Sequence, residues 1–422
     1  MRMTEAEKRV IRFLEAHKWG ILYAAVTVLS MFSRFGMRYF ASGDMADFLR
    51  PWADQIRANG GFAALKEQVG NYGILYQTLI ALITCLPIPP EYGYKFLSIF
   101  FDYALGIVSA LIIRDLSGDR LKSFLTYSFL IMLPTVVLNS AAWAQCDSIF
   151  TFFCVLCFWL LIRGKYTPAF IAYGAAFAFK LQAVFLLPFL ILFYLRERKF
   201  SIFNFLMIPA VMMVSGLAGF LAGRSLLAPL QIYFDQAGQY EYISINYPSF
   251  WNLLVTDSTE TFYHELSPYC IAFTLTVLLA ELLVVIKGGG KSSKESYLFA
   301  AMVMSYTCVL LLPGMHDRYG YVYIIFGLIL AVLKPGSLIL FSLMVMMDMQ
   351  SYGFFLFGTL HMPSNVLGLM NTGCLISYML LWGREELYSG RDKDGRPLIR
   401  QTKYDTTEEE DERKRIGSTV EP

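Results

Sequence analysis

The hexapeptide Ser42-Gly43-Asp44-Met45-Ala46-Asp47 separates a long apolar run from an amphipathic segment that ends near Gly70. Two carboxylates therefore lie where the chain leaves a stretch that could cross a membrane. Charged side chains at such a boundary need a polar cavity or a charged partner, and they often mark a functional site. We therefore expect a site that includes Asp44 or Asp47.

The composition is that of a polytopic membrane protein. Apolar residues make up 56% of the 422 residues and charged residues only 16%, unlike a soluble domain. The charged residues form short clusters between apolar runs, and the formal net charge is only +2, so no nucleic-acid-binding surface is indicated. Cys154 and Cys157 lie one helical turn apart with no nearby His, which favours core packing over metal binding.

Runs of about 20 apolar residues predict transmembrane helices. We expect an all-α bundle of roughly 11–13 spans, because two further stretches are ambiguous. Residues 72–88 form a short run, and the run 168–195 is interrupted by Lys180 and Gln182. The clear runs are 18–37, 94–113, 121–141, 148–162, 202–222, 269–286, 297–312, 319–333, 336–350 and 365–382.

Clusters of Lys and Arg predict the orientation, since these residues collect on the cytoplasmic side. All the clusters can be cytoplasmic if 168–195 is a helical hairpin with Lys180 near its outer tip, and if 72–88 enters the membrane without crossing. Both termini would then be cytoplasmic. The external face would carry the tip at Lys180 and the loops 41–71, 142–147, 223–268, 313–318 and 351–364.

The first external loop, residues 41–71, should contain two short amphipathic helices in the membrane interface. Pro51 is tolerated only in a first helical turn, so a helix should start near Asp47, with Asp47 as its N-cap. Capping is thus an alternative to chemistry for Asp47, whereas Asp44 has no such explanation. The apolar residues at helical spacing are Leu49, Trp52 and Ile56, followed after a glycine break by Phe62, Leu65 and Val69.

Residues 1–383 are expected to form one transmembrane domain, and residues 384–422 a charged, disordered cytoplasmic tail. No soluble catalytic domain and no internal repeat is visible, so any activity must come from the helices and their outer loops. The long external loop 223–268 is rich in aromatic residues. Such rings anchor proteins at membrane surfaces, and they can also stack on sugar rings.

Polar motifs from distant parts of the chain fall on the predicted external face. A helix cap would explain Asp147 or Asp317 as well as chemistry does, and Lys180 could reach the interface along its apolar stem. Together with Asp44, the cations Lys180 and Arg318 would form a cavity for an anionic lipid headgroup. The motifs are Gly43-Asp44-Met45, Trp143-Ala144-Gln145-Cys146-Asp147-Ser148, Phe179-Lys180-Leu181-Gln182-Ala183 and His316-Asp317-Arg318-Tyr319.

The order of these motifs resembles that of the GT-C superfamily of membrane glycosyltransferases, in particular bacterial relatives of the GPI-anchor and dolichol-phosphate-mannose-dependent mannosyltransferases. The resemblance covers residues 30 to about 325. Members often have Lys-Pro-Gln where this chain has Lys180-Leu181-Gln182, and Glu in place of Asp317. The matching features are Gly43-Asp44, a Trp-x-Gln-x-Asp at 143–147, a Lys-x-Gln-Ala at 180–183 and a His-acid-Arg-Tyr at 316–319.

The resemblance implies a GT-C-like fold and a hexosyltransferase of the bacterial cell membrane that works on the external face. Its donor would be a polyprenyl-phosphate-linked sugar, for which a mannose-like hexose is our guess. The acceptor would be a hydroxyl of a glycan, a lipid or a protein, and the anomeric centre would be inverted. The general base would be Asp44, with Asp47 as the second candidate.

The remaining motif residues receive roles in binding. The donor phosphate would be held by Lys180, His316, Arg318 and Tyr319. A divalent metal could be bound by Asp44, Asp47 and His316, but the sequence requires none, because Lys and Arg already supply positive charge. The residues expected to bind sugar hydroxyls or to orient Arg318 are Trp143, Gln145, Asp147, Gln182 and Asp317.

Two other classes of protein compete with this interpretation. A transporter or flippase for a lipid-linked sugar would also need an anion site of Lys and Arg within a helical bundle. Transporters usually place such residues on broken helices near mid-membrane, within repeated halves, whereas here they lie at outer ends. A purely structural membrane subunit would leave the external polar motifs unexplained.

Overall fold

The computed structural model describes residues 3–236, 241–255, 260–287, 292–359 and 362–389. Most of the described chain is helical, and a two-residue parallel pair joins β1 (Ser244–Ile245) to β2 (Met315–His316). The α-helices are α1 (Glu5–Gly36), α2 (Arg50–Ala58), α3 (Ile74–Thr84), α4 (Pro90–Ser117), α5 (Arg120–Met132), α6 (Pro134–Val137), α7 (Asp147–Ile162), α8 (Tyr166–Phe179), α9 (Leu187–Glu197), α10 (Met207–Ser215), α11 (Leu217–Leu221), α12 (Ala228–Gln236), α13 (Glu260–Lys287), α14 (Lys294–Leu311), α15 (Tyr321–Leu333), α16 (Leu338–Phe357) and α17 (Ser364–Ser389).

Within the described ranges, five helices are long and apolar enough to cross a membrane, namely α1, α4, α13, α16 with its preceding turn, and α17. A sixth span results if α5 and the helical segment 134–142, which meet at 47°, are counted together. The chain is thus an all-α membrane protein. Several expected spans instead form shorter apolar helices, such as α7 and α15. The predicted tail begins as the end of α17, and residues 390–422 lie outside the described part.

The centre of the bundle consists of α14 and α15. Every residue from Ser296 to Leu311 in α14 is buried, as is all of α15 except Val332. A helix that is apolar on all sides lies either in a protein core or in lipid, and the burial of α14 and α15 shows that other parts of the protein surround them. The loop between these two helices carries the His-acid-Arg-Tyr motif, so its two ends are held by the most buried part of the protein.

The predicted hairpin within 168–195 is confirmed. Helix α8 ends at Phe179, Lys180 is extended (φ −155°, ψ 135°), and α9 follows a 3₁₀ turn. Tyr166 at the start of α8 stacks on Phe200 just beyond the end of α9, with ring centroids 4.6 Å apart. The two helices are therefore antiparallel, and Lys180 lies at the turn between them.

The prediction that Asp47 caps a helix is wrong. The helical segment starts earlier, and Ser42 Oγ accepts a hydrogen bond from the Met45 amide (3.2 Å). Residues Met45–Leu49 form a π-helical turn, so that the Arg50 amide reaches back to the Met45 carbonyl. A π-turn adds a residue to the helix, and here it directly precedes Pro51, which cannot donate a backbone hydrogen bond.

The segment between the glycine break and α3 also differs from expectation. The second amphipathic helix is only a 3₁₀ turn, Gly61–Lys66. Most of the predicted apolar face is buried inside the protein, since Ile56, Leu65 and Val69 are at most 2% exposed and belong to the hydrophobic core, whereas Phe62 is 41% exposed. At 1.5 Å per residue, α3 extends only about 17 Å, roughly half the apolar thickness of a bilayer.

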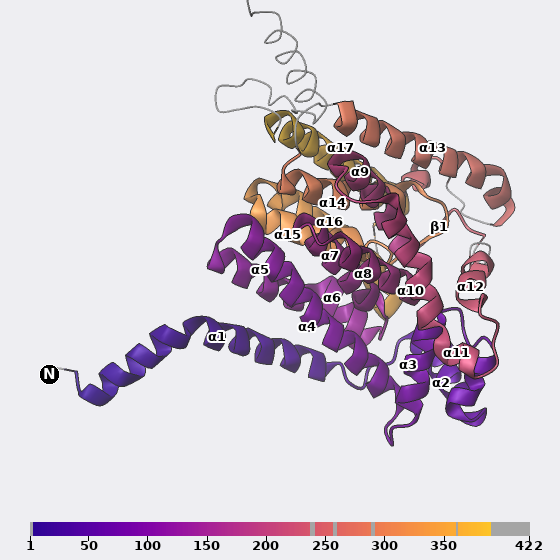
Figure 1. Cartoon of the computed structure of the whole chain (residues 1–422), viewed down its shortest axis with the longest axis horizontal. Coiled ribbons are helices and arrows are strands. Elements are labelled where there is room, and N and C mark those ends of the chain that lie inside the picture. The colour runs from indigo at the N-terminus through magenta and orange to yellow at the C-terminus, as the bar shows by residue number, and fades with distance from the viewer. Residues whose placement is uncertain (1–2, 237–240, 256–259, 288–291, 360–361, 390–422) are drawn as a thin grey trace, which may run out of the picture.

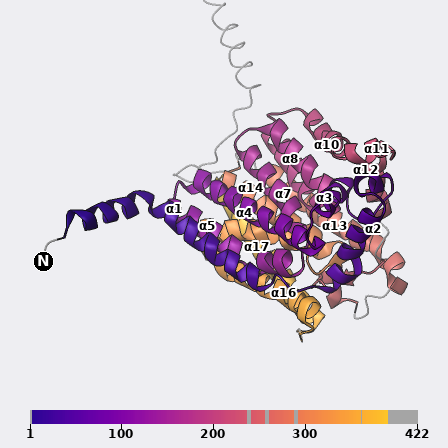
Figure 2. The same ribbon diagram turned by 90° about the horizontal axis from the view of Figure 1, so that it is seen from below.

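The helices are arranged unevenly around the bundle. Both views show α2, α3, α11 and α12 gathered at one end of the molecule, while the N-terminal half of α1 extends away from it (Figures 1 and 2). The C-terminal end of α1 is attached to α4. Lys95 of α4 is buried, and its Nζ donates hydrogen bonds to the carbonyl oxygens of Met37 (2.9 Å) and Phe40 (2.6 Å).

Replacing Lys95 with Met should detach the end of α1 from α4, because the carbonyls that follow α1 lose their charged donor. Charged hydrogen bonds contribute about 1.5–3 kcal/mol each, so we expect a lower melting temperature of the detergent-purified protein. The matched control is Lys66→Met, since Lys66 is exposed. Equal melting temperatures for the two variants would contradict this role of Lys95.

Candidate functional site

All four motifs meet around one cavity of about 530 Å³. Its lining contains most of the predicted site residues, together with apolar side chains that include Trp52, Phe185 and Phe355. Trp143 and Asp147 lie behind the lining and contact it. The predicted site residues that line the cavity are Asp44, Gln145, Lys180, Gln182, His316, Asp317, Arg318 and Tyr319.

Asp44 is the point at which three segments converge. Its Oδ2 accepts hydrogen bonds from Trp143 Nε1 and Gln145 Nε2, both at 2.8 Å, and lies 3.5 Å from Arg318 Nη1. All these contacts use the same oxygen. The second oxygen, Oδ1, takes part in none of them, and the carboxylate remains 16% exposed where it lines the cavity.

An unusual backbone conformation brings Trp143 and Gln145 to the same carboxylate. Ala144 between them is buried and has φ +60°, in the left-handed region. This conformation costs a non-glycine residue roughly 1–2 kcal/mol. The turn follows a π-helical segment, Leu138–Ala142, and its Gln145 amide donates to the Asn139 carbonyl (3.0 Å). The strain is therefore located at the contact with Asp44.

Arg318 continues the polar contacts to the buried end of α7. Its Nε lies 3.6 Å from Asp147 Oδ2, and Lys180 Nζ bonds to Asp147 Oδ1 at 2.5 Å. Asn139 Nδ2 also donates to Asp147 Oδ2 (2.8 Å). Asp147 and Lys180 are only 1% and 3% exposed, and removing one partner of such a buried pair is strongly destabilising.

These contacts form a chain of alternating charge, Asp44–Arg318–Asp147–Lys180, which we call the ionic chain. The ionic chain contains two carboxylates and two cations, so its formal charges cancel. Asp147 is also the first residue of α7, where the helix dipole favours a negative charge. Its contacts with both cations show that it does more than stabilise the start of a helix.

Aromatic rings surround the two cations. The Arg318 guanidinium lies 5.2 Å from the Trp143 ring centroid, and Lys180 Nζ lies 5.4 Å from that of Tyr72. The Tyr72 hydroxyl donates to Gln145 Oε1 (2.8 Å), which directs the amide nitrogen to Asp44. Sequence analysis missed Tyr72, because a single tyrosine in an ambiguous apolar stretch carries no signal of its own.

His316 and Asp317 have pKa values far from those of free side chains. Burial, together with the positive charges of Arg318 and Lys180, lowers the pKa of His316 to about 3, so the imidazole is neutral at physiological pH. Burial raises the pKa of Asp317 to about 7, although Arg318 opposes this shift. His316 therefore adds no positive charge to the cavity, and the charge of Asp317 changes near neutral pH.

Two other predicted residues differ in their surroundings. Asp47 is exposed, does not line the cavity, and makes no ion pair within the described ranges. Gln182 lines the cavity, and its Oε1 is buried without a hydrogen-bond partner among the described residues. A buried acceptor of this kind is costly unless a ligand or water satisfies it. In the described part of the chain, no group of three or more His, Cys, Asp or Glu is placed to hold a metal ion.

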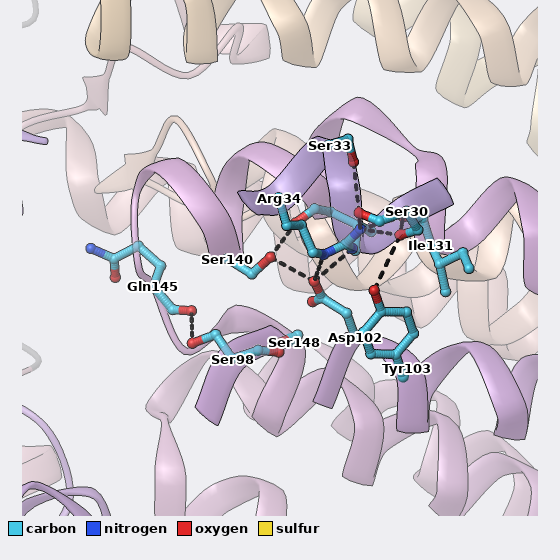
Figure 3. Close-up of polar contacts among 11 residues, drawn as sticks. Ser30, Ser33, Arg34, Ser98, Asp102, Tyr103, Ile131, Ser140, Gln145 and Ser148 are labelled. Carbon is cyan, nitrogen blue, oxygen red and sulfur yellow. Dashed lines mark hydrogen bonds and ion pairs between the residues drawn. The ribbon is translucent and has the colours of Figure 1, made fainter. Parts of the chain in front are cut away.

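A second buried ion pair lies beneath the turn at 143–147 (Figure 3). Arg34 of α1 donates from Nη2 to Asp102 Oδ2 of α4 at 2.9 Å, and from Nη1 to the Ile131 carbonyl at 2.8 Å. Ser140, in the π-helical segment before Trp143, donates to the same Asp102 oxygen (2.5 Å). Three helical segments are thus joined at one carboxylate.

The same face of α4 also holds the turn directly. Ser98 lies one helical turn before Asp102, and its hydroxyl donates to the Gln145 carbonyl (2.7 Å). The Ser148 hydroxyl donates in return to the Ser98 carbonyl (2.9 Å), as Figure 3 shows. The position of Gln145, and hence its contact with Asp44, depends on this face of α4.

Comparison with models of known protein families and with curated proteins finds no match to this chain. The chemistry of the cavity is therefore the ground for assigning a function.

Replacing Arg34 with Met should leave the buried Asp102 carboxylate without its cation, which costs about 3–5 kcal/mol in a buried pair. We expect a clear fall in the melting temperature, and partial recovery when Asp102→Leu is added. Arg163→Met is the matched control, because its partner Asp115 is on the surface (41% and 25% exposed side chains) and such pairs contribute about 0–1 kcal/mol. Equal losses at both sites would refute the structural role of Arg34.

The raised pKa of Asp317 predicts a pH-dependent stability. Between about pH 4 and pH 7 the folded protein holds a proton on Asp317 that the unfolded chain has released. The contribution of this group to stability therefore falls as the pH rises toward 7 and is constant above it. Asp317→Asn should remove this slope. Melting temperatures of both proteins across this range test the prediction, and parallel curves would contradict it.

Proposed function

We propose that this chain is a membrane glycosyltransferase of the GT-C type, which moves one hexose from a polyprenyl-phosphate donor to an acceptor hydroxyl. One observation supports this most strongly. A single carboxylate oxygen of Asp44 is held by Trp143, Gln145 and Arg318 at the wall of a cavity of about 530 Å³. The other oxygen is then oriented without being used, as a general base requires.

The role of Asp44 follows from this geometry. An acceptor hydroxyl at Oδ1 would give up its proton while its oxygen attacks the anomeric carbon. The lipid phosphate would leave from the opposite face of the sugar, which inverts the anomeric centre. General-base assistance of this kind contributes about 10²- to 10⁴-fold to the rate.

The leaving phosphate needs positive charge in a poorly hydrated site. Arg318 and Lys180 are the cations of the cavity wall, and Arg318 can bind a phosphate with two parallel hydrogen bonds. Both cations already face carboxylates. A phosphate that attracted Arg318 would weaken its contact with Asp44 and thereby make Asp44 a stronger base when donor is bound.

The neutral groups of the cavity suit a sugar. The partnerless Oε1 of Gln182 can accept a hydrogen bond from a sugar hydroxyl. His316, which is neutral, and Tyr319 can hydrogen-bond the phosphate or the sugar. The apolar side chains of Trp52, Phe185 and Phe355 offer a surface for the first isoprene units of the donor.

The proposed orientation follows from the Lys and Arg clusters, which collect on the cytoplasmic side. The cavity would open to the external face of a bacterial cell membrane, and both termini would lie in the cytoplasm. The acceptor would be a hydroxyl of a glycan, a lipid or a protein.

The test is to supply the purified protein with a radiolabelled polyprenyl-phosphate hexose and to measure release of polyprenyl phosphate. Asp44→Asn should lower the rate by about 10²-fold or more, while Asp47→Asn, in the exposed residue outside the cavity, should change it less than twofold. Melting temperatures confirm that both variants are folded.

Unchanged turnover in Asp44→Asn would remove Asp44 from the mechanism. A larger loss in Asp47→Asn than in Asp44→Asn would exchange their assignments. Movement of intact donor between the leaflets, without release of polyprenyl phosphate, would favour a transporter or flippase over a transferase.

A further inference from the structure

A second cavity, of about 500 Å³, adjoins the first. The two share Ile245 and Asn246 as lining residues, so Asn246 is a side chain common to both spaces. The described lining of the second cavity is polar but contains no Asp, Glu, Lys, Arg or His. It consists of Tyr242, Ser244, Ile245, Asn246, Tyr247, Asn252, Val255, Ser364 and Asn365.

This lining contrasts with that of the first cavity. The first contains Asp44, Lys180 and Arg318, whereas the lining residues of the second that the structure describes offer amides, hydroxyls, aromatic rings and short apolar side chains. Amides and hydroxyls both donate and accept hydrogen bonds, which matches the hydroxyl groups of a carbohydrate. A charged ligand would lose water there without gaining an opposite charge, and such desolvation is unfavourable.

The backbone of this second cavity is held in place rather than left as an open loop. β1 pairs with β2 so that Ile245 lies opposite His316, and Asn246 forms a further bridge to His316. The Tyr247 hydroxyl bonds to that of Tyr323 in the buried helix α15 (2.9 Å), and the Tyr247 carbonyl accepts from Asn252 Nδ2 (3.0 Å). The cavity is therefore formed before any ligand arrives.

Asn246 itself is arranged for contact with a ligand. Its φ of +56° places it in the left-handed region, which Asn tolerates better than most residues. Asn246 is exposed, and its side-chain amide makes no hydrogen bond to another described residue, so the amide is accessible to a ligand. Strained backbone of this kind often accompanies ligand-binding positions.

We propose that the second cavity binds an uncharged, polyhydroxylated ligand, a glycan, and that the Asn246 amide hydrogen-bonds to it. A ligand that extended past Asn246 would enter the cavity that contains Asp44. If the ligand is the acceptor of the reaction, the acceptor is a neutral glycan. This part of the inference rests on the proposed transferase function.

Binding is tested without any donor, on the full chain in nanodiscs, by saturation-transfer NMR. The probes are neutral trisaccharides of mannose, glucose and galactose, each compared with its uronic-acid counterpart. Asn246→Gly removes the amide and fits the positive φ without strain. Asn59→Gly is the matched control, because Asn59 is an exposed residue at the end of α2 that lines neither cavity.

We expect at least one neutral trisaccharide to bind the wild type and Asn59→Gly equally, with affinity about threefold to tenfold weaker in Asn246→Gly, as for loss of one hydrogen bond. Absence of binding by every neutral probe, equal binding to Asn246→Gly, or equally strong binding of the uronic acids would overturn the inference.

These outcomes are separate from those for the transferase proposal. A protein that binds the neutral sugar but never releases polyprenyl phosphate would refute the proposed reaction and leave the glycan site standing. If release does occur, Asn246→Gly should raise the KM for acceptor by the same threefold to tenfold and change the KM for donor by a smaller factor, since Asn246 also lines the first cavity. Equal KM values for acceptor in wild type and variant would overturn the glycan site alone.

Discussion

A charge that is buried in an apolar helical bundle must be paired, and this constraint shapes the whole site. Asp147 and Lys180 are almost completely buried, so each needs an opposite charge: Lys180 pairs with Asp147, and Asp147 also faces Arg318. Lys180 comes from the turn between α8 and α9, Asp147 from the start of α7, and Arg318 from the loop between α14 and α15. The requirement for pairing therefore brings three distant segments together, and Asp44 joins them through Arg318.

The irregular backbone of the protein lies where these charges meet. Two π-helical turns, Met45–Leu49 and Leu138–Ala142, flank the two sides of the contact between Asp44 and Trp143. Ala144 is strained, and the helical hairpin breaks at Lys180. In a membrane, backbone that departs from regular helix is tolerated only where protein surrounds it or where it lines a cavity. Each irregularity here places a side chain of the candidate site.

The charge balance of the site bears on its chemistry. Both cations of the ionic chain face carboxylates, so an anionic ligand must take contacts from Asp44 or Asp147 instead of filling an unpaired positive pocket. The proposed reaction uses this competition, because a phosphate at Arg318 would leave Asp44 more basic. The second cavity has no charged side chain among its described lining residues and so provides a separate environment for the proposed uncharged ligand. Two adjoining spaces of different polarity fit a transfer between a charged donor and an uncharged acceptor.

The sequence by itself determined the membrane class, the motifs of the site and the break at Lys180, because composition, apolar run length and isolated charges report directly on burial. It also predicted that Asp44, Lys180 and Arg318 meet, and all three line one cavity. The tertiary structure alone decided that Asp47 stays outside the cavity, that Tyr72 orients Gln145, and that Asn246 lies between two spaces. Pattern and spacing describe the environment of a residue along its own helix. Contacts between residues far apart in the chain, such as Trp143 and Asp44, form only when the helices pack. Each buried polar group then needs a hydrogen-bond partner.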